Sequence, residues 1–240
     1  MTKVFEIKGE FKMKKIRNII IALTLVITGI TASAQSGHDT GNGYKFYIDD
    51  PMNRNTLTFK SEAPLEDIIG TSNQINGFVN FDPENPQNNA SADFNVPVLS
   101  LNTGIPMRDE HLQGPAWLDA AAYPDLNLKI NKVKKATLLK EMDNSKTFEL
   151  AVIGNFTMHG ITKEVSFPAR LTFLAENKMT QMRLPGNLLV IRADFAIPLA
   201  EYNVTGPKDM KIIGAKISEE IKISVNLMGS TVSQSLAQEN

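Results

Sequence analysis

The chain has 240 residues, and 25 Lys and Arg nearly balance 26 Asp and Glu, so the formal net charge is −1. That balance gives little electrostatic attraction to phosphate backbones, and we expect no nucleic-acid partner. The chain has no cysteine, which excludes disulfides, thiolate metal sites, a cysteine nucleophile and lipid attachment to an N-terminal Cys.

The first 34 residues are predicted to be a signal peptide. Four basic residues between positions 12 and 17 precede an apolar run from Ile19 to Ile30, which is too short for a comfortable membrane span. Ala32-Ser33-Ala34 has the small residues of a cleavage site before Gln35, and Met13 offers an alternative start codon. We therefore expect a periplasmic or secreted product without stable membrane insertion, the alternative being an uncleaved N-terminal anchor.

Apolar and polar residues alternate with period two through most of the remaining chain, which predicts strand after strand. The alternating stretches lie at 56–60, 75–82, 92–98, 126–130, 148–158, 165–173, 191–197 and 221–227. We expect a lysine-rich bend after Ile130, and turn signals such as Pro185-Gly186-Asn187 separate other strands. About eight or nine strands in one domain, 44–228, indicate an all-β sandwich or barrel between flexible tails at 35–43 and 229–240.

The longest alternation runs from 148 to 173 and predicts a hairpin with one apolar face. Gly160, after His159, is free to adopt a positive φ, so we expect the chain to reverse there. Gly154 adds no side chain to the apolar face, which leaves space or permits a bend. By parity that face carries Phe148, Leu150, Val152, Phe156, Val165, Phe167, Leu171 and Phe173.

One stretch, 106–122, departs from the strand pattern and predicts a short helix. Pro115 suits a first helical turn, the alanines behind it favour helix, and Pro124 ends it. A short helix between the strands of a barrel can cap one end. Leu112 and Trp117, the only tryptophan, are the expected plugs.

Five ordered motifs resemble the YceI-like, polyisoprenoid-binding family. In chain order they are FDPENP after an apolar strand; SLNTG; RDEHL (Arg108 to Leu112) with Trp117-Leu118-Asp119 and Tyr123-Pro124; NFTMHGITKEVSF; and Arg192-Ala193-Asp194-Phe195. The resemblance covers roughly Tyr44 to Met228. Phe46 stands where the family usually has its opening Trp, and the segments 177–187 and 202–216 depart from the pattern.

The resemblance implies an eight-stranded antiparallel lipocalin-like barrel with a short helical cap. Its lumen would hold a polyprenol- or quinone-like chain, and no cofactor is expected. We expect the lumen to be lined by Phe46, Leu57, Phe59, Phe94, Val96, Trp117, Phe148, Leu150, Val152, Phe156, Val165, Phe167, Leu171, Phe173 and Phe195. Each buried CH₂ of such a ligand contributes up to ~0.8 kcal/mol.

Two other arrangements of the apolar face remain open. An eight-stranded barrel can fill its interior with side chains, and alternation alone does not separate a filled barrel from a hollow one. A transmembrane barrel would turn the apolar face outward and carry aromatic girdles. Four Tyr, one Trp and the terminal SLAQEN do not favour it.

The polar candidates are few. His111 and His159 lack the spacing of a known metal motif. The simpler interpretation is that His111 forms a local hydrogen bond that holds the cap helix, and that His159 occupies a turn position where its backbone tolerates an unusual φ. Arg108 either belongs to a capping charge run or contacts an anionic head group of the ligand.

Two classes of function remain. The first is an extracytoplasmic protein, with a homodimer left open, that binds an apolar chain for transport, storage or sequestration. The second is a metal- or haem-dependent accessory that uses His111 and His159. No nucleophilic serine motif, phosphate-binding glycine loop or spaced carboxylate pair occurs, so we do not expect an enzyme.

Overall fold

The computed structural model describes residues 43–62, 66–88, 90–206 and 218–235. The predicted signal peptide, the N-terminal tail up to residue 42 and the last five residues lie outside the described residues. Among the described residues, no helix combines the length and the apolar character needed to cross a membrane.

Ten strands, two α-helices and two 3₁₀ helices follow one another along the described chain. In chain order they are β1 (Tyr44–Ile48), β2 (Thr56–Glu62), β3 (Asp67–Ser72), β4 (Asn76–Phe81), β5 (Ser91–Pro97), η1 (Val98–Ser100), α1 (Pro106–Gln113), β6 (Asp125–Met142), β7 (Ser145–Met158), β8 (Ile161–Leu174), α2 (Lys178–Gln181), β9 (Leu188–Pro198), η2 (Leu199–Tyr202) and β10 (Glu220–Ser230).

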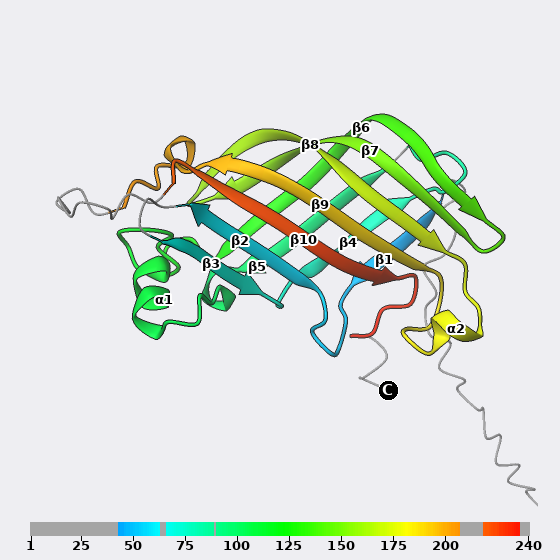
Figure 1. Ribbon diagram of the computed structural model, residues 1–240, viewed down its shortest axis with the longest axis horizontal. Helices are drawn as coiled ribbons and strands as arrows, with labels where there is room; N and C mark the ends of the chain where they lie inside the picture. The colour runs from blue at the N-terminus through cyan, green and yellow to red at the C-terminus, as the bar shows by residue number, and fades with distance from the viewer. Residues whose placement is uncertain (1–42, 63–65, 89, 207–217, 236–240) are drawn as a thin grey trace, which may run out of the picture. The chain divides into compact units, whose positions relative to one another are not determined.

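The strands form a closed antiparallel barrel (Figure 1). The order around it is β1-β4-β5-β6-β7-β8-β9-β10, and Tyr47 of β1 pairs with Ser230 of β10 to close the ring. β1 and β2 both pair with β10, one after the other along its length. In the same way β4 pairs with β1 and β3 pairs with β2. Two of the eight positions are therefore each shared by two strands, which confirms the predicted eight-stranded antiparallel barrel.

The central hairpin has the predicted register and turn. Met158 pairs with Ile161, and His159 and Gly160 between them both have positive φ, 51° and 73°. Gly154 serves a different purpose from the one its position in the apolar face indicated. A Cβ there would lie 2.3 Å from the Lys129 carbonyl oxygen of β6, so glycine allows the two strands to approach each other.

The lysine-rich segment after Ile130 is strand, not the expected bend. β6 continues to Met142 and stays paired with β7, with irregularities in the register at 130/132, 133/135 and 138/140. Such bulges add residues that the alternation cannot follow, which is why the periodicity ended at Ile130. β3 was also missed, because Asp67–Ser72 has no clean alternation of polar and apolar residues.

The helix lies within the predicted stretch 106–122 but ends earlier than expected. α1 begins at Pro106 and ends at Gln113, and the segment 114–123, which includes Pro115, forms turns. Asp119 has a positive φ of 47°, and the Leu118 N–H donates to the Leu112 carbonyl. The turns place Leu118 in the core.

The expected flexible C-terminal tail is also corrected for residues 229–235. Gly229 and Ser230 belong to β10, and the Asp49 carboxylate accepts hydrogen bonds from the Ser233 hydroxyl and the Gln234 N–H at 2.7 and 2.8 Å. Polar residues without an apolar pattern gave no sign of this contact in the sequence.

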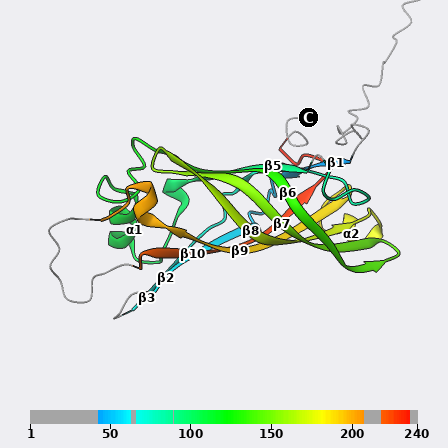
Figure 2. The ribbon, with the colours of Figure 1, turned by 90° about the horizontal axis from the view of Figure 1, so that it is seen from above.

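The two ends of the barrel carry different elements. α1 lies at one end of the long axis, and α2 lies at the other together with the β6–β7 turn (Figures 1 and 2). The end near α2 is filled by aromatic rings. Phe46 contacts Tyr44 and Phe173, at ring-centroid distances of 6.0 and 6.3 Å, and Phe81 contacts Phe148 at 5.7 Å.

Candidate functional site

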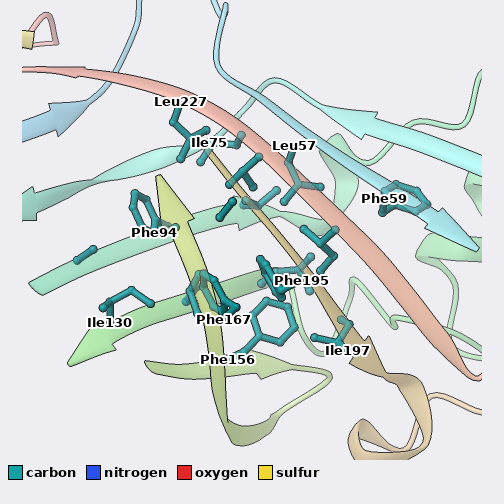
Figure 3. A pocket seen from close by; sticks show the side chains of 18 of the residues that line it. Leu57, Phe59, Ile75, Phe94, Ile130, Phe156, Phe167, Phe195, Ile197 and Leu227 are labelled. Carbon is teal, nitrogen blue, oxygen red and sulfur yellow. The ribbon is translucent and has the colours of Figure 1, made fainter. Parts of the chain in front are cut away.

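Between the aromatic end and α1 the barrel encloses a cavity of about 190 Å³ (Figure 3). Its walls are hydrocarbon from almost every strand. Among the described residues, the only polar ones that line it are Ser61, Asn80 and Ser91, and none of the lining residues is charged. A space with these walls can hold an uncharged apolar group but offers nothing to neutralise an ion.

The cavity exists because small residues alternate with large ones on the inner surface. Ala92, Ala169 and Ala193 face inward from β5, β8 and β9 and line the space. Phe167 and Phe195 stack against each other at 4.3 Å, which draws their rings together on one wall. Figure 3 shows Phe156 beside this pair. Ala169 and Ala193 lie next to the paired rings on the same two strands, and their short side chains leave volume that the rigid barrel wall does not fill.

The floor of the cavity is the aromatic end of the barrel. Phe81 lines the cavity and also meets Phe148 edge to face, with 70° between the ring planes. Behind them Phe46 is fully buried, and Tyr44 stacks on Phe173 at 5.7 Å. A chain that enters the cavity therefore stops at this group of rings.

The roof is the segment around α1. Leu112, Trp117 and Leu118 line the cavity from this side. The Trp117 ring packs over Gly206, where a Cβ would lie 2.5 Å from the ring, so glycine is needed for this contact. The predicted role of Leu112 and Trp117 at one end of the barrel agrees with this placement.

Tyr202 closes the same end from the side of η2. It is almost fully buried and packs edge to face on Phe156 at 5.7 Å. Burial, with a smaller effect of the neighbouring Glu201 carboxylate, raises the pKa of its hydroxyl to about 12. The phenol therefore stays neutral at physiological pH and can remain within the apolar wall.

The structure separates the predicted lumen residues into two groups. The following eleven line the cavity: Leu57, Phe59, Phe94, Val96, Trp117, Leu150, Val152, Phe156, Phe167, Leu171 and Phe195. Phe46, Phe148 and Phe173 lie instead in the aromatic end, and Val165, beside Gly154, is half-buried without lining the space. All of them face inward by parity, but the parity does not say at which level a side chain lies along the barrel axis.

Several lining residues were not singled out from the sequence. Ile191, Ile197, Ile223 and Leu227 lie on predicted strands and share the inward parity, so a systematic count along each strand would have found them. Ile68 and Leu101 gave no such signal, because β3 and the segment after η1 are not periodic.

Arg108 does not line the cavity. Its guanidinium lies 2.7 Å from the Glu66 carboxylate, which connects α1 to the start of β3. This geometry favours the structural interpretation of the charge run, and the head-group role stays a prediction.

The two histidines are held locally. The His159 ring lies 4.7 Å from the Tyr123 ring, and its Nδ1 is 3.2 Å from the Tyr202 carbonyl oxygen. His111 is exposed on the last turn of α1. In the part of the chain that the structure describes, no three His, Cys, Asp or Glu side chains lie together in a way that could hold a metal ion. The metal alternative thus finds no support in the described site.

Comparison with protein families identifies the barrel. The family model described as the YceI-like domain matches residues 47–228. The chain belongs to the YceI-like family. A UPF0312 protein of Yersinia pestis is 29% identical over 150 residues, which cover 60% of this chain and 69% of that protein. The predicted resemblance is therefore confirmed over the whole barrel.

Solved structures share the YceI-like fold. BcnA of Burkholderia cenocepacia matches with a TM-score of 0.56 and 21% identity over 75% of this chain and 99% of its own. A polyisoprenoid binding domain from Saccharophagus degradans, implicated in plant cell wall breakdown, matches with a TM-score of 0.57 and 11% identity over 79% of this chain and 99% of its own. At these identities the likeness concerns the fold.

Proposed function

We propose that this YceI-like protein is an extracytoplasmic binding protein that holds one long apolar chain, such as an isoprenoid, in its barrel. The observation that carries the proposal is the cavity itself, which lies between the aromatic floor and the α1 segment and whose lining, in the part of the chain that the structure describes, is apolar apart from Ser61, Asn80 and Ser91. The order of basic, apolar and small residues in the first 34 positions supports export.

The energetics of burial agree with a ligand of this class. A chain of methyl and methylene groups gains up to ~0.8 kcal/mol for each CH₂ moved from water into such a space. A few isoprene units would therefore offset the cost of association. The fold-level likeness to a domain described as polyisoprenoid binding supports the same class of ligand.

The apolar lining formed by the described residues also favours one orientation of the ligand. A polar or charged head group would lose its hydration among hydrocarbon walls without a partner. The ligand is therefore bound with its tail toward the Phe81 floor and its head near the α1 segment, where Glu66 is exposed and Arg108 is half-buried.

The role is one of binding, and we propose no reaction for this site. Within residues 43–62, 66–88, 90–206 and 218–235, the lining offers no carboxylate, imidazole or lysine that could transfer a proton, and its hydroxyls belong to Ser61 and Ser91. Ser61 already accepts a hydrogen bond from the Ser218 N–H at 2.9 Å.

Extraction of the purified protein with organic solvent, followed by mass spectrometry, tests the proposal. We expect a long-chain apolar lipid near one equivalent per chain, and saturable binding of a fluorescent farnesyl probe after the lipid is removed. A lipid-free protein that never binds the probe would contradict a carrier, and stoichiometric metal or haem would favour the other class of function.

A further inference from the structure

We propose that the aromatic floor limits how much of an apolar chain enters the cavity, so that the protein selects its ligand by chain length, with Phe81 as the residue that determines the limit. This length limit rests on the proposed lipid-binding function and adds to it the size of the preferred ligand. The floor rings are those of Tyr44, Phe46, Phe81, Phe148 and Phe173.

Toward α2 the lining of the cavity ends at Phe81, which is only 2% exposed. The ring of Phe148 lies edge to face against it at 5.7 Å, and Phe148 does not itself line the cavity. Tyr44 is the direct partner of Phe81 in the register between β1 and β4, so a further ring comes from the neighbouring strand. A chain that reaches Phe81 therefore meets packed rings.

The rings behind Phe81 support one another. Phe46 contacts Tyr44 and Phe173 edge to face, at 6.0 and 6.3 Å, and Tyr44 stacks on Phe173 at 5.7 Å. Pairs of rings in these arrangements are stabilised beyond the area that they bury, and a densely packed interior yields little to an added group. Because the floor rings come from β1, β4, β7 and β8, moving them would separate side chains of four strands. The floor is therefore a fixed stop.

The roof is held less firmly than the floor. α1 has no buried residue, and Leu112 and Trp117, which line the cavity from this side, are half-buried. Phe46, Phe81 and Phe148 at the floor are at most 4% exposed. Any part of a chain that exceeds the depth of the cavity therefore extends past the roof, where it stays in water and adds little to the affinity.

The depth of the cavity gives the expected limit. On β7 the lining residues run from Leu150, two positions after Phe148, to Met158. These two positions are eight residues apart, and at about 3.3 Å per residue on a strand tilted by about 40° they span roughly 20 Å along the barrel axis. Because C–C bonds of about 1.5 Å alternate in direction, an extended chain advances about 1.3 Å per carbon, and about 15 carbons fill this depth. The preferred ligand is therefore an amphiphile with a chain of about 15 carbons along its length, which corresponds to about four isoprene units.

The test uses n-alkylphosphocholines, from decyl to eicosyl in steps of two carbons, as ligands of graded length. Each is added below its micelle concentration to lipid-stripped protein that carries a fluorescent farnesyl probe, and displacement of the probe gives the affinity. The zwitterionic head group is strongly hydrated, so it stays outside the hydrocarbon walls while the alkyl chain enters.

Two substitutions change the floor and one changes the wall. Phe81→Ala removes the floor ring that faces the cavity, and Phe81→Leu is a milder change that decides the matter where the alanine protein does not fold. The matched control is Phe94→Ala, which removes a ring of the same size from the side wall and leaves the floor intact (Figure 3). Circular dichroism of each protein checks that it is folded before affinities are compared.

For the wild type we expect the affinity to rise at least about threefold with each two carbons up to about 15, and by less than about 1.5-fold beyond, because only methylene groups inside the cavity leave water. The chain length at which the rise ends should increase by about four carbons in Phe81→Ala, since a phenyl ring spans about 5 Å, and by about two carbons in Phe81→Leu. Phe94→Ala should keep the wild-type limit, because a wider wall does not deepen the cavity.

A wild-type affinity that keeps rising up to the eicosyl chain would overturn the length limit, and so would an unchanged limit in the folded Phe81 variants. An equal shift in Phe94→Ala would also overturn it, because any enlargement of the cavity would then have the same effect. If the wild-type protein does not bind the farnesyl probe at all, the proposed function itself fails.

Discussion

The two halves of the barrel interior share one sequence pattern but differ in how they are filled. Toward α2, rings from β1, β4, β7 and β8 meet one another, and Phe46 and Phe148 are almost fully buried. Toward α1, large side chains such as Phe94 face a space of about 190 Å³ and are only partly covered. The difference lies in the size of the inward side chains, since alanines on β5, β8 and β9 line the hollow half whereas aromatic rings fill the other.

The two halves show that the direction of a side chain and the filling of the interior are separate properties, although the alternating pattern in the sequence is the same for both. Period two tells which side chains face inward, because successive side chains on a strand point to opposite faces. Whether the interior is filled depends on the summed volume of side chains at each level of the barrel. Stability is therefore expected to depend on the filled half, and ligand binding on the hollow half.

The largest expected effect comes from removing a ring in the filled half. Phe148→Ala should lower the free energy of unfolding by about 3–5 kcal/mol, because a ring packed against Phe81 leaves a void. Phe94→Ala is the matched change in the hollow half and should cost about 1–2 kcal/mol, since its ring already borders a space. Denaturant melts of both variants measure the difference, and equal losses would mean that the two halves are not distinct.

A buried ion pair also stabilises the filled end. The Asp50 side chain is 1% exposed and lies 2.7 Å from the Arg54 guanidinium. Arg54→Ala should cost about 2–3 kcal/mol, because it leaves a buried carboxylate with only backbone partners. Lys222→Ala, which breaks an exposed pair with Glu62, is the control and should leave the denaturation midpoint nearly unchanged. If both variants lost a similar amount of unfolding free energy, the effect of Arg54→Ala would reflect the removal of any positive charge and not the buried pair with Asp50.

Most of the fold could be predicted from the sequence, and the reason is the regular alternation. The strands, the reversal at His159-Gly160 and the cap at Trp117 follow from periodicity, turn chemistry and the family resemblance. Three parts of the sheet were not predicted. β1 has only five residues, β3 has no alternation, and the second half of β6 has bulges that shift the alternation.

The cavity was less predictable than the barrel. The sequence placed Phe46, Phe148 and Phe173 on the inner face, but their packing against one another depends on contacts between strands distant in the chain. The helix was expected to include Pro115 and the alanines behind it but ends at Gln113, because intrinsic helix propensity is weak compared with tertiary packing such as the burial of Leu118. Long-range packing therefore decided the points that local patterns left open.

A moderate effect is expected at the boundary between the cavity and solvent. Trp117 is half-buried, lines the cavity and packs over Gly206, so Trp117→Ala should lower the free energy of unfolding by about 2 kcal/mol. Trp117→Phe keeps most of the apolar area and should recover much of that loss. Fluorescence cannot be used for the variants that lack this Trp, so circular dichroism in urea is the measurement. A loss below about 1 kcal/mol would show that the ring contributes little to the roof.

A smaller effect is expected in acid at the filled end. Burial alone would raise the pKa of the Asp50 carboxyl, but the Arg54 guanidinium and the Met52 N–H hold it below its ordinary value of 3.8. The contribution of this carboxylate to stability is therefore complete above pH 3.8 and is lost as the pH falls through the lower pKa of the folded state. Thermal melts between pH 5 and pH 2 should show a shallower acid loss for Asp50→Asn than for the wild type, whereas parallel curves would remove Asp50 from this account.

The most direct test of a hollow, ligand-holding half is one substitution measured in two ways. Val152 lines the cavity, so Val152→Phe should fill space without displacing packed side chains. We expect the free energy of unfolding to change by less than about 0.5 kcal/mol, while the affinity for a fluorescent prenyl probe falls strongly. Overpacking a filled core costs about 1–3 kcal/mol. A loss of that size, together with a wild-type protein that does not bind the probe, would contradict the account.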